Sequence, residues 1–167
     1  MKSQIKQMWK AAREPLFDVK DFSRDLVGIA KENLAADDCL TSTGFIITED
    51  SIVCFSVDFA DHTEKEFAYR ELVEEANNVN AKFIVTLNDA YAGNREDAQD
   101  YYLGKLADIG SEECICIIAT GPKLKSWTIE VPYRRTPDGI VFGEAVEEEG
   151  GQIGFLEGWT YEERQVH

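Results

Sequence analysis

Residues 45–87 read "FIITEDSIVCFSVDFADHTEKEFAYRELVEEANNVNAKFIVTL", and this stretch decides the predicted fold. Two apolar runs, 45–47 and 52–57, flank the acidic pair Glu49 and Asp50. Apolar runs around a short polar break predict an antiparallel hairpin. The second run is almost wholly apolar, which is typical of a central strand that is buried on both faces.

The segment after this hairpin has the signals of a helix followed by another strand. Thr63 and Glu66 are spaced as a capping box, in which the two side chains satisfy N–H groups of the first turn. Apolar residues then recur at helical spacing, at Ala68, Leu72, Ala76 and Val79. A strand over 81–87 comes next, so the order strand–helix–strand predicts a right-handed crossover between two parallel strands.

The flanking segments add further elements on both sides. The spacing of apolar residues predicts a basic amphipathic helix over 1–14 and a second helix from about Asp18 to Leu34, capped by Asp18 or Asp21. Another helix is predicted to begin at Asn94. The remainder is predicted to be strands, with a turn at "TPDG", residues 136–139.

Taken together, these elements predict one domain over residues 1–167, a length that suffices for a sizeable core. The expected class is α+β (mixed α/β): a central mixed sheet of five to six strands with helices packed on it. The expected order is αα-ββ-α-β-α-β-β-β. An acidic, glycine-ended loop is expected at 144–151 and a frayed tail at 162–167.

The charge of the chain restricts its partners. The sequence has 17 basic and 32 acidic residues, a net charge of −15. Direct binding of nucleic acid is therefore disfavoured, because contacts with phosphates need a surplus of cations. Anionic membranes are disfavoured for the same reason. No apolar run approaches the ~20 residues that span a bilayer, and the N-terminus lacks the apolar region of a secretory signal. We therefore expect a cytoplasmic protein with no membrane span.

The cysteines and the missing motifs argue against several enzyme classes. Cys54, Cys114 and Cys116 lie in apolar, strand-like runs, where a reduced cysteine packs as a small hydrophobe. The spacing of Cys114 and Cys116 is not the C-x-x-C of zinc sites. Glycine-rich phosphate loops, the G-x-S-x-G elbow and the zinc-deaminase motif are all missing from the sequence.

One polar cluster has two interpretations. Asp58, Asp61 and His62 follow a strand, and Asp89 follows the next strand, so all four are expected at one edge of the sheet. In the first interpretation Asp58, Asp61 and Asp89 bind Mg²⁺ or Mn²⁺, and His62 is the acid/base of a metal-dependent hydrolase or phosphotransfer-type enzyme. In the second, these residues only cap a helix and form a turn.

The preferred hypothesis is a non-catalytic accessory or binding protein that acts through protein–protein contact and needs no cofactor. An acidic surface and an aromatic–arginine patch would contact the partner, either another protein or a second copy of the chain. The candidate residues are Trp127, Tyr133, Arg134, Arg135, Glu147, Glu148 and Glu149. The competing interpretation is that the arginines only screen nearby acids such as Glu130.

Overall fold

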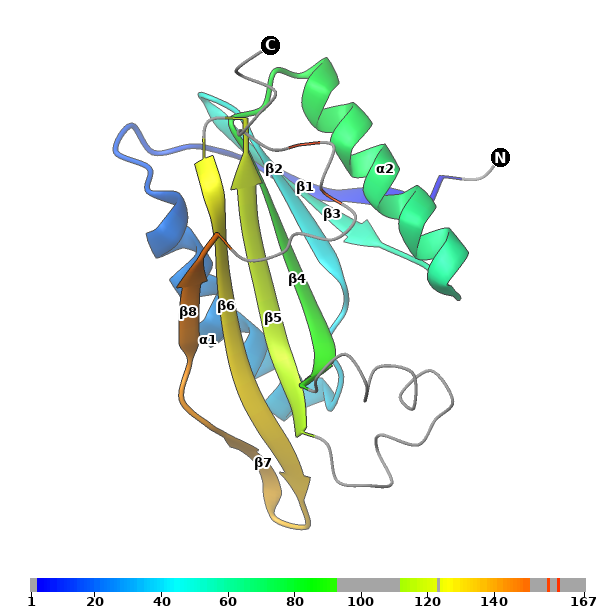
Figure 1. Cartoon of the computed structure of the whole chain (residues 1–167), viewed down its shortest axis with the longest axis vertical. Coiled ribbons are helices and arrows are strands. Elements are labelled where there is room, and N and C mark those ends of the chain that lie inside the picture. The colour runs from blue at the N-terminus through cyan, green and yellow to red at the C-terminus, as the bar shows by residue number, and fades with distance from the viewer. Residues whose placement is uncertain (1–2, 93–111, 123, 151–155, 157–158, 160–167) are drawn as a thin grey trace.

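The protein is described by a computed structural model that covers residues 3–92, 112–122, 124–150, 156 and 159. Within these residues the chain forms one large antiparallel sheet of eight strands with two helices (Figure 1). The sheet order is β1-β3-β2-β4-β5-β6-β7, and β8 also pairs with β6. The elements are β1 (Ile5–Ala12), α1 (Val19–Asp37), β2 (Thr43–Ile47), β3 (Ser51–Val57), α2 (His62–Asn78), β4 (Phe83–Ala92), β5 (Glu112–Gly121), β6 (Leu124–Thr136), β7 (Gly139–Phe142) and β8 (Val146–Glu149).

The predicted mixed α/β sheet of five to six strands is wrong, because every neighbouring pair in the described sheet is antiparallel. The hairpin of β2 and β3 forms as expected, with Phe45 opposite Cys54. β3 and β4 do run in the same direction, but β2 lies between them and pairs with both. The buried residues 44–47 of β2 explain this position, since an interior strand needs a hydrogen-bonding partner on each edge.

The N-terminal segment is strand β1 and not the predicted helix over 1–14. It pairs with β3 from Ile5 opposite Val57 to Ala12 opposite Ser51, and a bulge at Met8 interrupts the register. The pairing covers an edge of β3 whose N–H and C=O groups would otherwise remain open. Apart from Ile5 the strand is exposed, so its apolar spacing does not reflect a buried helical face.

The caps of the two helices are Asp18 and Asp61, both of which the sequence offered as caps, but the capping box predicted for the second helix is wrong. Asp18 caps α1, where its Oδ1 accepts hydrogen bonds from the N–H groups of Lys20 (2.8 Å) and Asp21 (3.0 Å). The cap of α2 is Asp61 and not Thr63. Its Oδ1 accepts from the Glu64 N–H at 2.8 Å, while the Glu64 carboxylate accepts from the N–H of Ala60. The reciprocal pair therefore lies two residues before the predicted one.

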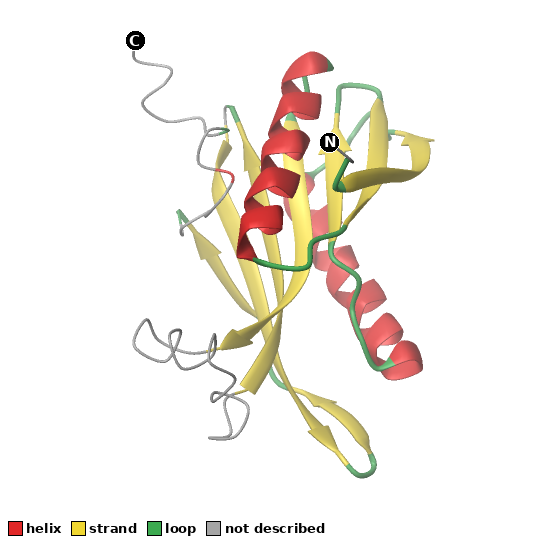
Figure 2. Ribbon diagram, turned by 90° about the vertical axis from the view of Figure 1, so that its right-hand side faces the viewer, coloured by secondary structure: helices red, strands yellow, loops and turns green. Residues whose placement is uncertain are grey.

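The two helices pack on opposite faces of the sheet and create two separate cores (Figure 2). Alternate strand residues point to opposite faces, so the interior strands β2, β3, β4 and β5 contribute to both cores. The core under α1 includes Leu26, Ala30, Leu34, Val85, Ile117 and Ile129. The core under α2 includes Ile46, Ala68, Leu72, Ala76, Ile84 and Trp159.

In the C-terminal half, the strands β5, β6 and β7 follow one another as two successive hairpins. β6 and β7 meet at the predicted turn, with Thr136 opposite Gly139, whose φ of 126° suits glycine. The segment 144–151, expected as a loop, contains β8. Cys54 and Cys114 are buried, in agreement with their assignment to the core. The helix expected from Asn94 and the tail at 162–167 lie outside the described residues.

Candidate functional site

The acidic residues at the strand ends do not form a three-ligand group in the described part of the chain. Asp58 follows β3 and Asp89 lies in β4, but β2 separates these strands. Their backbones are thus two strand spacings apart, about 10 Å. Asp61 caps α2, and the side chain of His62 lies outside the described part of the structure.

Asp89 instead lies close to a polar network on the α1 face of the sheet. Glu113 of β5 pairs with Tyr133 of β6, and Arg135 Nε donates to Glu113 Oε2 at 2.8 Å. Arg135 Nη1 also donates to the backbone carbonyl of Asp38, the C-cap residue of α1, at 2.9 Å. The network links the end of α1 to the strands. Its members are far apart in sequence, and no local pattern indicates their proximity.

The environment of Asp89 disfavours its charged form. Partial burial raises the pKa of the Asp89 carboxyl above its ordinary value, and the nearby Glu113 carboxylate raises it further. Arg135 and Tyr133 act in the opposite direction. Because much of the Asp89 side chain is still in contact with solvent, screening by water limits how much the raised pKa changes the stability of the fold.

Asp89→Asn is therefore expected to raise the stability of the protein at neutral pH. A raised carboxyl pKa stabilises the fold below the unfolded value of 3.8, and this contribution is lost as the pH rises through the folded pKa. In urea unfolding between about pH 4 and pH 7, the free energy of unfolding of the variant should increase relative to that of the wild type as the pH rises. A stability difference between variant and wild type that stays constant over this pH range would contradict the raised pKa of Asp89.

The residues of the proposed aromatic–arginine patch do not come together on one surface. Tyr133 is 1% exposed and belongs to the core under α1. Trp127 also faces α1, where the Lys20 Nζ lies 4.3 Å from the ring centroid. Arg135 shares this face but is held in the network with Glu113, whereas Arg134 alternates to the other face and is exposed.

The predicted acidic residues Glu147–Glu149 form most of strand β8, here called the acidic edge (residues 146–149). All four residues are exposed, and Val146 retains 60% of its accessible surface. Glu147 is paired with Arg24 of α1, with 2.7 Å between Oε1 and Nε. Among the described strands, the acidic edge pairs only with β6. The expected acidic surface is therefore also a sheet edge.

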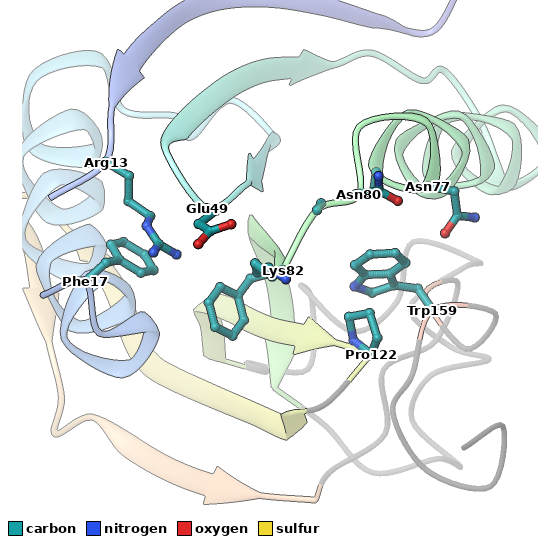
Figure 3. A pocket seen from close by; sticks show the side chains of 11 residues that line it. Arg13, Phe17, Glu49, Asn77, Asn80, Lys82, Pro122 and Trp159 are labelled. Carbon is teal, nitrogen blue, oxygen red and sulfur yellow. The ribbon is translucent and has the colours of Figure 1, made fainter. Parts of the chain in front are cut away.

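A cavity of about 700 Å³ lies at the end of the sheet opposite to Asp89 (Figure 3). It is lined by residues of the β1–α1 connection, the β2–β3 turn, the end of α2, the start of β4 and the position after β5, and by Trp159. Figure 3 shows Arg13 and Phe17 on one side and Asn77, Asn80 and Trp159 on the other, with Lys82 between them. Sequence reasoning missed this site because its residues come from separate segments without a shared motif.

Comparison with known proteins finds no matching family model and no significantly similar curated protein or solved structure. Any functional assignment therefore depends on the residues of this chain. Neither of the described helices, α1 or α2, is long and apolar enough to cross a membrane.

Proposed function

We propose that the protein is a non-enzymatic accessory protein that binds a protein partner through the acidic edge. One observation carries this proposal: β8 pairs with β6 alone among the described strands. Its outer row of N–H and C=O groups therefore has no described strand beside it. Such an edge can receive an extended segment of another chain, which gains affinity from main-chain hydrogen bonds.

The charge of this edge favours a basic partner segment. Glu147 and Glu149 lie opposite Ile129 and Trp127 and share the α1 face, whereas Glu148 lies on the other face. Glu148 and Glu149 have no ion pair with a described residue, and Glu147 is paired with Arg24. A strand with lysines on both faces would place a cation beside each glutamate, an arrangement that stabilises cross-strand pairs.

The two other sequence-based hypotheses receive less support. Pairing of two acidic edges in a homodimer would place like charges opposite one another, which is destabilising. For the metal-dependent enzyme, no observation on the described residues favours a shared ion at Asp58 and Asp89.

Charge reversal at the acidic edge tests this proposal. The probe is a fluorescent peptide in which valines flank a run of consecutive lysines, so that lysines lie on both faces of the added strand, and its affinity is measured by anisotropy. We expect Glu148→Lys/Glu149→Lys to weaken binding by at least about tenfold, because two attractive pairs become repulsive. Raising the salt from about 0.05 M to about 0.5 M should also weaken binding to the wild type.

Two controls separate edge pairing from general charge attraction. Glu32→Lys/Glu74→Lys makes the same change in charge at exposed helix positions and should leave the affinity unchanged. A peptide with a central proline should bind poorly, since proline lacks the N–H needed for a strand ladder. Equal binding of both peptides, or equal loss in both double variants, would rule out the acidic edge as the binding surface.

A further inference from the structure

We propose that the cavity lined by Arg13 and Trp159 binds a small planar aromatic compound that carries a single carboxylate. The cavity volume of about 700 Å³ falls within the usual range for small-molecule sites, about 300–1,000 Å³. This inference is independent of the acidic edge, because the lining includes no residue of β8.

The first argument is that two buried hydrogen-bond donors have no partner. Arg13 Nε and Trp159 Nε1 are both buried and form no hydrogen bond within the described protein. Both residues line the cavity. A buried N–H group without a partner is energetically costly, and a ligand carboxylate that reaches Arg13 would offset this cost at Arg13 Nε.

The second argument is the positive charge of the lining. Arg13 and Lys82 form no ion pair with any described residue, although the chain has a net charge of −15. The Arg13 backbone N–H donates to the Asp50 carbonyl at 2.9 Å, and its guanidinium lies 5.5 Å from the centroid of the Phe17 ring. The first contact fixes the backbone at Arg13, and the second places its guanidinium beside an aromatic ring. A guanidinium matches a carboxylate with two parallel hydrogen bonds.

The charge balance of the lining favours one negative charge on the ligand. Glu49 lines the same cavity, and Figure 3 shows it between Arg13 and Lys82. Its carboxylate would repel a doubly charged group such as a phosphate monoester, because like charges nearby are unfavourable. A monocarboxylate meets two cations and one anion, and the attraction exceeds the repulsion.

The third argument is the aromatic wall. The rings of Phe17 and Phe83 have centroids 6.0 Å apart and planes inclined by 39°. Trp159 and Pro122 provide further apolar surface to the same cavity. Aromatic groups pack favourably against such inclined or offset rings. A flat ring would contact this wall while its carboxylate reaches Arg13.

The experiment uses 2-naphthoate as the probe and measures its binding to the full chain by titration calorimetry. Two related compounds separate the contributions of ring and charge. The neutral 2-naphthamide and the non-aromatic cyclohexanecarboxylate should each bind at least about tenfold more weakly. Arg13→Gln should weaken 2-naphthoate by about tenfold and leave 2-naphthamide nearly unchanged. Arg134→Gln removes an exposed arginine of β6 and should have no effect.

Several outcomes would overturn the inference. These are the absence of saturable 2-naphthoate binding at millimolar concentration, equal affinity for acid and amide, or an equal effect of Arg13→Gln and Arg134→Gln. Should Arg13→Gln fail to fold, Lys82→Gln gives the same test, because this exposed side chain contributes charge without packing in a core. The comparison of acid and amide on the wild type remains decisive without any variant.

Discussion

Gly121→Ala is expected to lower the free energy of unfolding by about 3 kcal/mol, because the new methyl group has no room. A Cβ atom at this position would overlap the carbonyl oxygen of Lys82 and lie 3.3 Å from Cδ1 of Phe83. The carbonyl cannot move easily, since the Lys82 N–H donates to the Ile47 carbonyl at 2.7 Å. Urea unfolding followed by circular dichroism measures the change.

Gly28→Ala is the matched control for this substitution. A Cβ atom at Gly28 meets nothing within 4 Å, and the residue lies in the middle of α1. The same chemical change should therefore stabilise the protein by about 0.5–1 kcal/mol, the usual gain for alanine over glycine in a helix. Similar effects at the two glycines would show that the close approach of β5 to Lys82 is absent in solution.

Ile117→Ala is expected to lower the free energy of unfolding by about 4 kcal/mol. The Ile117 side chain is fully buried, and the residue lies between Leu87 and Ile129 in the register of β4, β5 and β6. Its loss removes apolar contacts and leaves a cavity under α1, and a rigid sheet relaxes little to fill it.

The control for Ile117 is an isoleucine on the same side of the sheet that faces solvent. Ile29 of α1 is 49% exposed, so Ile29→Ala should change the stability by less than about 0.5 kcal/mol. Both variants remove the same side-chain atoms, from a buried position in β5 and from a half-exposed position in α1, and chemical denaturation compares them directly. A small effect at Ile117 would mean that the central register of the sheet is not the one described.

The sequence was sufficient to predict an element where its local signals and the burial of its residues agreed. The hairpin of β2 and β3 follows from two apolar runs around a short polar break, and α2 follows from the spacing of Ala68, Leu72 and Ala76. The turn between β6 and β7 follows from the residues of "TPDG". In each of these segments the residues that determine the structure are neighbours along the chain.

Prediction failed where pairing depends on distant residues. β1 shows a helical spacing of Ile5, Met8 and Trp9, but the open edge of β3, about forty to fifty positions further along the sequence, makes it a strand. β8 contains three consecutive glutamates, an unfavourable composition for a strand, yet it pairs with residues 127–130 of β6. Edge strands expose most side chains and therefore carry little of the apolar signal used in prediction.

The candidate sites show the same contrast between features that follow from neighbouring residues and features that depend on distant ones. The exposed position of Glu147–Glu149 could be predicted, because a run of acidic residues is rarely buried. The sequence also placed Asp58 and Asp89 at one end of the sheet, but it could not show that β2 lies between their strands. The cavity beside Arg13 depends on segments from residue 13 to residue 159, and only the folded chain brings them together.

The interior position of β2 has a consequence for the kinetics of folding. Ile47 of β2 pairs with Ile52 across a tight turn and with Phe83 only after α2 has been traversed. Closing the short loop costs much less chain entropy than closing the long one. The β2–β3 hairpin should therefore form early, and docking of β4 onto it should limit the folding rate. Substitutions at the β2–β4 contact are then expected to slow folding more than those at the edge strand β1.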